Sequence, residues 1–363
     1  MKRYILFLGL AITFVYGCKP TDNSCATNFD QTALLTNIAN NIISPSYDSL
    51  KLRVDALSVA VNAFTSAPSQ LTLDSARTAY RNAGLIWQKA MIFEFGPAET
   101  YQLRASLNNF PVFEGRLEFA AQGGNYNLEI DSFSYTRGFP AIDYLLYAGA
   151  TDDAGHIALF DTDSNAQKRR QFLLNVMAQI KSKTDAVHTG WATYKSTFIG
   201  TTGLSTGSPL SLLVNQLNQN YELFKNNKLG NPVGAKVSYI ASPDKVEAKH
   251  SGLSLDFALA SLYATREVFT GKDGSGLDDF IAATGAEKDG QPLQNVILNQ
   301  FNNIAASLEG LRPESLYNSI LNNFNAVKTA YGQSQNQVVY LKTDMPSVLC
   351  ISISYVDNTD DGD

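Results

Sequence analysis

Apolar residues recur every third or fourth position over most of the chain from residue 29 onward. This spacing places them on one face of a helix, so it predicts a series of amphipathic helices. A Phe-Gly-Pro sequence at residues 95–97 should end one of these helices, because Gly and Pro break helical structure. Its apolar stripe is Leu73, Ala76, Tyr80, Ala83, Trp87 and Met91.

The pattern divides into two halves that are joined by a small, polar segment. Residues 200–207 contain three glycines and read as a flexible linker. We therefore predict an all-α fold with two tandem up-down four-helix-bundle-like domains, at residues 29–199 and 208–363. Two similar bundles also suggest an internal duplication. Within them we expect a loop at residues 151–165 and one long helix at about 243–269.

The first residues read as a targeting signal rather than as part of a bundle. Lys2 and Arg3 precede an apolar run at residues 4–16, which is too short to span a bilayer. The run ends in a lipobox-like sequence, Val15-Tyr16-Gly17-Cys18. We expect residues 1–17 to be a signal peptide, Cys18 to be lipidated, and residues 18–28 to form a tether. The alternative is an ordinary signal peptide that is cleaved nearby.

The net charge bears on the partners of the protein, and the cysteines bear on a possible disulfide. The formal net charge is −6, and removal of the two basic residues of the signal would make it −8. An acidic chain is a poor partner for nucleic acid, so we expect none. Besides Cys18, the chain has Cys25 and Cys350. A disulfide between them is compatible with an oxidising compartment, but their spacing does not establish it.

The candidate chemistry centres on residues 137–149. Gly138 and Pro140 suit the start of a helix, since Pro is tolerated where an N–H has no helical partner. We expect Asp143 to project from the first turn, near the positive end of the helix dipole. An apolar run then continues to Tyr147.

This stretch resembles the signature of imelysin-like proteins, a Gly-x-His-x-x-Glu motif followed by an aromatic-Leu-Leu run. Gly138 and residues 144–146 match it, whereas Pro140 replaces the His and Asp143 replaces the Glu. Three other segments resemble the family in the same order: the tryptophan helix ending at residues 95–97, the Ser- and Asp-containing segment at 247–257, and the end of the chain at 345–363.

Lys19 follows Cys18, where an Asp would signal retention at the inner membrane, so we expect the lipoprotein on the outer membrane. The resemblance implies that it acts as a binding component in iron or haem acquisition beside other envelope iron-uptake proteins. Its cofactor would be iron or another divalent cation. Asp143 is the remaining candidate metal ligand, because in the family the His and Glu of the motif are the proposed ligands. The implied cleft lies between the bundles. Its expected lining is Gly138, Pro140, Asp143, Trp87, Phe95, Ser251, Ser254, Asp256 and Arg266.

Two alternatives remain open. One is a metallopeptidase of the imelysin type, although the motif offers a single carboxylate, Asp143. We therefore assign no catalytic residue. The other is a partner- or glycan-binding lipoprotein that has lost the metal site.

Overall fold

The computed structural model describes residues 28–355, and most of these residues are helical. The two described strands, β1 (Glu287–Lys288) and β2 (Gln291–Pro292), form one short antiparallel hairpin. The predicted all-α fold of two helical bundles is confirmed.

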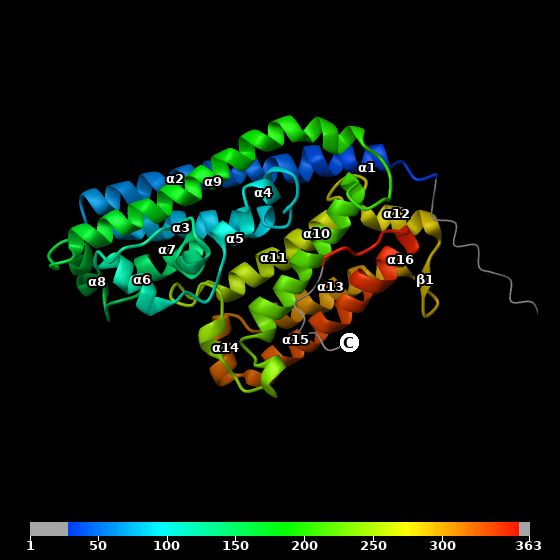
Figure 1. Ribbon diagram of the computed structural model, residues 1–363. Coiled ribbons are helices and arrows are strands. Elements are labelled where there is room, and N and C mark those ends of the chain that lie inside the picture. The colour runs from blue at the N-terminus through cyan, green and yellow to red at the C-terminus, as the bar shows by residue number, and fades with distance from the viewer. Residues whose placement is uncertain (1–27, 356–363) are drawn as a thin grey trace, which may run out of the picture.

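The first half is built around three long helices. Helix α2 packs against both α3 and α9, and α7 lies between α3 and α9 (Figure 1). A π-helical turn, η1 (Ile38–Ile43), joins α1 to α2 without a break. The elements of this half are α1 (Gln31–Asn37), α2 (Ser44–Ser66), α3 (Gln70–Ala90), α4 (Pro97–Thr100), α5 (Leu103–Leu107), α6 (Glu114–Ala121), the 3₁₀ helix η2 (Asp131–Thr136), α7 (Gly138–Tyr147), α8 (Asp153–Phe160) and α9 (Ala166–Gly200).

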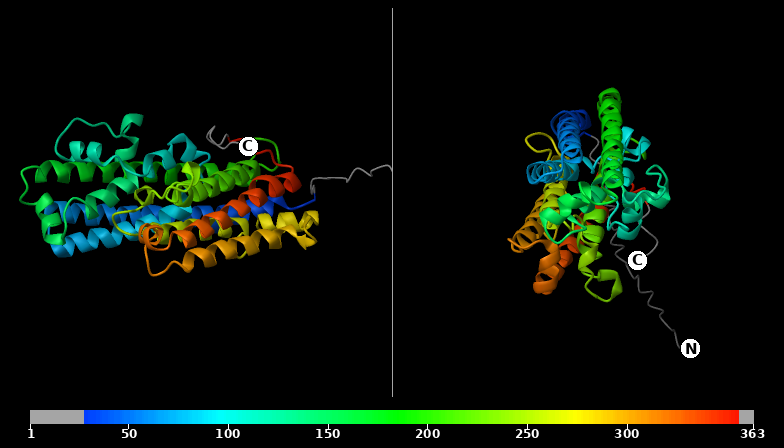
Figure 2. Two further views of the ribbon diagram at one scale, coloured as in Figure 1. Left: turned by 90° about the horizontal axis from the view of Figure 1, so that it is seen from below. Right: turned by 90° about the vertical axis from the view of Figure 1, so that its left-hand side faces the viewer.

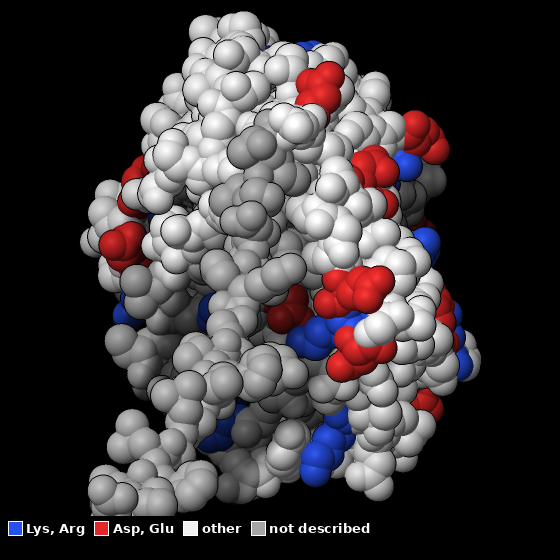
Figure 3. Space-filling view, turned by 90° about the vertical axis from the view of Figure 1, so that its right-hand side faces the viewer, with Lys and Arg blue, Asp and Glu red and all other residues white. Residues whose placement is uncertain are grey.

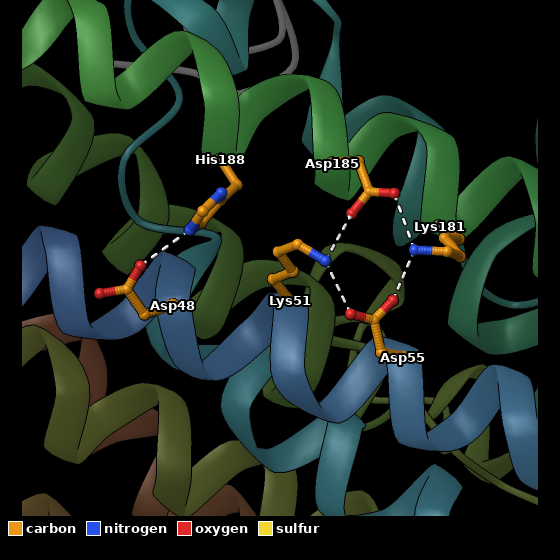
Figure 4. Close-up of polar contacts among 6 residues, drawn as sticks. All are labelled: Asp48, Lys51, Asp55, Lys181, Asp185 and His188. Atoms are coloured by element: carbon orange, nitrogen blue, oxygen red, sulfur yellow. Dashed lines mark hydrogen bonds and ion pairs between the residues drawn. The ribbon is translucent and has the colours of Figure 1, made fainter.

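An exposed ion network fixes the register between α2 and α9. Lys51 of α2 contacts Asp55 at 2.7 Å and Asp185 of α9 at 3.2 Å, and Lys181 of α9 contacts both acids (Figure 4). A separate pair joins His188 to Asp48 at 2.8 Å. Exposed pairs of this kind each stabilise a fold by less than about 1 kcal/mol. The buried apolar stripes therefore hold the helices together, and the charges set their alignment.

The second half begins at α10, after the segment that was expected to be a linker. Ser208 caps α10 by accepting a hydrogen bond from the Ser211 N–H, and Pro209 occupies the first helical position. Helices α10, α11, α13 and α15 form the second bundle. The elements are α10 (Pro209–Leu223), the π-helical η3 (Phe224–Gly230), η4 (Ala235–Val237), η5 (Pro243–Lys245), α11 (Ser254–Phe269), α12 (Leu277–Thr284), α13 (Leu293–Glu309), α14 (Leu316–Asn322), α15 (Phe324–Val339), the π-helical η6 (Tyr340–Asp344) and α16 (Met345–Leu349).

The halves meet where α3 packs against α11. Gly84 of α3 lies under the Phe257 ring of α11, and a Cβ at Gly84 would be 2.3 Å from the ring's Cζ atom. This close approach needs glycine, because no real Cβ contact is that short. The bundles lie side by side with an offset, so the molecule is elongated (Figure 2).

Two local expectations were wrong. The predicted helix at 243–269 is helical only in η5 and α11, because Ala248 and Gly252 have positive φ angles. The expected loop at 151–165 instead contains α8. Asp152 caps this helix by accepting a hydrogen bond from the Gly155 N–H at 2.8 Å.

Some expectations concern residues outside the described range. These include the signal peptide, Cys18, Cys25 and the acidic end of the chain. Cys350 is disulfide-bonded. Among the helices of residues 28–355, none combines the length and the apolar character that a bilayer crossing requires.

Charged side chains on the end of the molecule that carries α12 and α16 are few, and acidic and basic groups lie close together (Figure 3). The described part of this face therefore carries charges of both signs.

Candidate functional site

The motif helix α7 begins at a position that only glycine can occupy. Gly138 has a φ of +74°, and a Cβ there would lie 2.3 Å from the carbonyl oxygen of Leu107 in α5. Pro140 follows in the first turn, where its missing N–H leaves no helical bond unmade. These two residues therefore fix how α7 starts and how closely it packs on α5.

Asp143 connects the two halves of the protein. It is 2% exposed, and its Oδ2 and Oδ1 atoms accept hydrogen bonds from the backbone N–H groups of His250 at 3.0 Å and Ser251 at 3.2 Å. Burial raises the pKa of Asp143, while the contacts with Ser251 and His250 oppose that rise. Asp143 lies in the second turn of α7 and not in the first, so the expected helix-dipole position is wrong. Its carboxylate is satisfied by a loop of the other half.

Aromatic side chains of α3 cover the inner face of α7. Trp87 stacks on Phe139 at 5.9 Å, and Tyr80 lies near Asp143. Burial and the nearby Asp143 charge raise the pKa of Tyr80 well above its ordinary value. The expected proximity of Trp87 to the motif helix is thus present in the structure.

The surroundings of Asp143 do not fit a metal ion of the kind that the motif implies. Both oxygens of Asp143 face N–H donors, and Pro140 supplies no ligand atom. The His250 ring lies edge-on to Tyr144 at 5.1 Å and its Nε2 atom lies 3.4 Å from Glu114. Within residues 28–355, no group of three or more His, Cys, Asp or Glu side chains could hold a metal ion.

Of the other residues expected at the cleft, Ser251 contacts Asp143. It does so through its backbone N–H and its side chain, and its hydroxyl also lies within 3.3 Å of the Ala248 carbonyl oxygen. The remaining four lie elsewhere: Ser254 accepts from the Leu316 N–H, Asp256 pairs with Arg81 and Arg312, Arg266 lies near Tyr263, and Phe95 stacks on Phe198 within the first bundle.

A buried polar triad at the same interface was missed by sequence reasoning. Lys228 of η3 is 3% exposed, and its ammonium donates to Gln88 of α3 at 2.8 Å and to Glu247. Gln88 in turn donates to Glu247 at 3.1 Å. Burial lowers the pKa of Lys228, and the Glu247 carboxylate counters this effect. The three residues are far apart in sequence, so no local pattern could have indicated the contact.

A cavity of about 330 Å³ opens beside this triad, between α5 and its neighbouring loop on one side and α10 and η3 on the other. This volume is at the lower end of the range for small-molecule pockets. The lining includes five polar or charged side chains that matter below: Glu94, Arg104, Asn108, Gln219 and Lys228.

Arg104 and Glu94 dominate the electrostatics of the cavity. The guanidinium of Arg104 donates to the Met91 carbonyl oxygen at 2.8 Å and to Gln219 at 2.9 Å. The Glu94 carboxylate accepts the Arg104 backbone N–H at 3.1 Å. Burial raises the pKa of Glu94 to about 7, although Arg104 opposes the rise. Sequence reasoning missed both residues, because they follow a helix end and lie in no motif.

The chain is similar in sequence to one protein family and to one iron-regulated protein. The model of the imelysin family, peptidase group M75, matches residues 43–345. Iron-regulated protein A of Synechococcus elongatus is 30% identical over 143 residues, which are 37% of this chain and 39% of that protein. The chain thus matches well under half of that relative's length.

Two crystal structures share the fold. One, assigned provisionally as an iron-regulated protein A precursor from Parabacteroides distasonis, has a TM-score of 0.69 at 17% identity and covers 92% of this chain and 97% of its own. An imelysin-like protein from Psychrobacter arcticum has a TM-score of 0.67 at 18% identity, with coverages of 89% and 96%. Because the family model spans most of the sequence, this chain belongs to the imelysin family.

Proposed function

We propose that this protein is a non-enzymatic binding component of iron or haem acquisition in the cell envelope, and that its ligand occupies the cavity between the two bundles. The observation that carries the proposal is that cavity, with the half-buried Arg104 in its wall. The names of two relatives, both called iron-regulated protein A, support the link to iron.

The altered motif favours a structural role for α7 rather than direct binding of iron by its side chains. Asp143 uses both oxygens to hold the loop at residues 250–251, so this carboxylate joins the halves. The nearby cavity then binds the ligand, and the motif helix holds together the two halves between which the cavity lies. Iron would reach such a protein within a ligand rather than as an ion held by Asp143.

The anchoring part of the proposal concerns residues outside the described range. A lipid on Cys18 would hold the protein at the outer membrane, beside other envelope iron-uptake proteins. Replacing the residue, Cys18→Ser, should move the protein from the membrane fraction to the soluble fraction. Continued recovery of the variant with membranes would contradict lipid anchoring.

The function is tested by growth under iron limitation. A strain that lacks the protein should grow more slowly than its parent when iron is supplied at limiting concentration, and iron excess should remove the difference. Complementation with Asn108→Leu, a change in the cavity wall, should restore growth less well than complementation with Asn82→Leu, an exposed matched control. Equal growth of the deletion strain and its parent would overturn the proposal.

The competing metallopeptidase function makes a different prediction. Incubation of the full mature chain with a mixture of unstructured peptides should leave the peptides intact. Cleavage that a chelator abolishes and zinc restores would overturn the binding role in favour of the peptidase.

A further inference from the structure

Helix α2 carries a second row of apolar side chains on the side opposite its buried stripe. This outer row consists of Leu52, Ala56, Val59 and Ala63, all of them exposed. Leu52 is 64% and Val59 is 71% exposed. Steps of four, three and four residues place the four side chains on one face of the helix. A surface helix normally has polar residues on this side, so the outer row is suited to contact with another helix.

A shallow groove of about 390 Å³ runs beside the outer row, between α2 and α3. Its wall includes Arg53 and Ala56 of α2 and the exposed Leu71 and Asp74 of α3. The same face therefore offers a ridge, the outer row, and a groove into which such a ridge can pack. Contact of this face with a copy of itself fills both grooves at once, as a twofold interface requires.

The order of large and small residues in the outer row favours an antiparallel pair of α2 helices. When the twofold axis is level with the midpoint between residues 57 and 58, Leu52 faces Ala63 of the second copy. Ala56 then faces Val59 of the second copy, and the symmetry repeats both contacts. Each large side chain thus meets an alanine, which lets the helices interdigitate. A parallel pair would instead set large against large and small against small.

The two charged residues of the groove wall fit the same arrangement. The turn at residues 67–69 joins α2 to α3, so the helices run antiparallel and Asp74 is level with Asn62. In the antiparallel pair, Arg53 faces Asn62 of the second copy and therefore comes close to the Asp74 beside it. Within residues 28–355, neither Arg53 nor Asp74 has a partner of opposite charge. The twofold symmetry supplies such a partner to both.

The face is also large enough for a stable dimer. Helix α2 has 23 residues, so it is about 35 Å long. Two neighbouring helices are together about 20 Å wide. The outer surface of α2 and α3 is therefore about 700 Å² per copy, close to the roughly 800 Å² that each partner buries in a standard interface.

We infer that this protein forms an antiparallel homodimer through the outer face of α2 and α3. The groove shares no lining residue with the cavity between the two bundles. The inference therefore goes beyond the proposed function and does not depend on it.

Sedimentation equilibrium tests the dimer on the full mature chain carrying Cys18→Ser, which cannot be lipidated. We expect a dissociation constant of about 10 µM or tighter, as for other interfaces of this size. Val59→Glu sets a carboxylate against Ala56 of the second copy, and the symmetry does so twice. This variant should weaken the dimer at least about 100-fold, which is about tenfold for each buried charge. Val339→Glu, an exposed change on α15, is the matched control and should leave the dimer unchanged.

Two further tests determine the register. Arg53→Glu should weaken the dimer about tenfold, because two ion pairs become contacts between like charges, and the exchange Arg53→Glu with Asp74→Arg should restore it. Mild oxidation of a mixture of Leu52→Cys and Ala63→Cys chains should cross-link them. Leu52→Cys alone should not cross-link, because the two copies of this residue are about 16 Å apart along the helices.

A chain that remains a monomer at about 100 µM would overturn the inference, as would a dimer that Val59→Glu leaves intact. Circular dichroism checks that Val59→Glu remains folded, and the cross-linking experiment needs no disruptive change. Cross-linking of Leu52→Cys with itself, or failure of the charge exchange to restore the dimer, would overturn the antiparallel register. Growth under iron limitation reports on the proposed function alone, whatever the sedimentation gives.

Discussion

Asp143 carries the strongest residue-level argument, because one side chain joins two halves of the chain. Replacing it by Ala would leave the half-buried N–H groups of His250 and Ser251 without an acceptor. We expect Asp143→Ala to lower the free energy of unfolding by about 2–4 kcal/mol, and Asp143→Asn to cost less because one acceptor remains. Urea unfolding at pH 7 measures both changes.

The matched control for this prediction is Asp256→Ala. Asp256 also joins the halves, through Arg81 at 3.2 Å, but the Arg81 side chain is 56% exposed. An exposed pair contributes less than about 1 kcal/mol. If Asp143→Ala lowers the free energy of unfolding no more than Asp256→Ala does, the buried contact of Asp143 does not stabilise the interface.

A second residue, Glu94, gives a prediction on pH. Burial raises its pKa from 4.5 to about 7, so the folded protein keeps a proton that the unfolded chain releases in this range. The associated stability is fully present below about pH 4.5 and is lost as the pH rises through 7. The free energy of unfolding of Glu94→Gln, measured relative to that of the wild type, should therefore rise by about 2–3 kcal/mol from pH 5 to pH 8.

The comparison with the wild type at each pH is essential, because His156 has the opposite slope. Burial lowers its pKa from 6.5 to about 4, so its contribution to stability rises with pH in that interval. This contribution is common to both proteins and cancels in the difference. A constant difference from pH 5 to pH 8 would mean that Glu94 titrates normally.

At the scale of elements, Gly84 makes α3 and α11 depend on each other. Gly→Ala normally stabilises a helix interior by about 1 kcal/mol. At Gly84 the new Cβ would overlap the Phe257 ring, so we expect Gly84→Ala to destabilise the protein by about 1–3 kcal/mol. Thermal unfolding measures the change.

Gly332 of α15 is the control, because a Cβ there would meet nothing within 4 Å. Gly332→Ala should stabilise the protein slightly. If both substitutions shift the unfolding temperature in the same direction, the close approach of α3 and α11 has no energetic consequence.

The sequence predicted helices correctly where apolar residues kept a helical spacing over many residues. The stripe from Leu73 to Trp87 is buried in α3, and the helix ends before Gly96-Pro97 as expected. The period was misleading at residues 246–253, where long-range hydrogen bonds to Asp143 hold a non-helical loop. Tertiary contacts decided that segment, and local spacing does not contain them.

The candidate site was predicted less completely than the fold. The motif segment marked Gly138 and Asp143, which both have close contacts at the junction. It gave no sign of Arg104, Glu94 or Lys228, because their roles arise from burial between segments that are distant in sequence. Asp256 and Phe95 were chosen by resemblance, and the fold turns them toward an exposed ion pair and an aromatic core.

At the scale of the whole molecule, the triad of Gln88, Lys228 and Glu247 should govern whether the halves unfold together. Removing one charge strands the other in the interior, so Lys228→Met or Glu247→Leu alone should cost about 3–5 kcal/mol. The double variant should cost less than either single change, because no unpaired buried charge remains. Chemical unfolding of all four proteins completes the double-mutant cycle.

If the loss of unfolding free energy in the double variant equals the sum of the losses in the two single variants, the two residues are not coupled. A second transition in the unfolding curve of a single variant would be informative as well. It would mean that the halves separate before either one melts, and that the triad, with Asp143, makes them one cooperative unit.

The π-helical turn η3 also determines which changes in chain length the junction tolerates. A π turn holds one residue more than an α-helical turn, because its hydrogen bonds join residues i and i+5. Deleting one residue between 224 and 227 would return the segment to α-helical winding and keep Lys228 on nearly the same side of the helix. The ammonium would then still face Gln88 and Glu247. A further inserted residue would instead turn Lys228 away from both partners by about 100°.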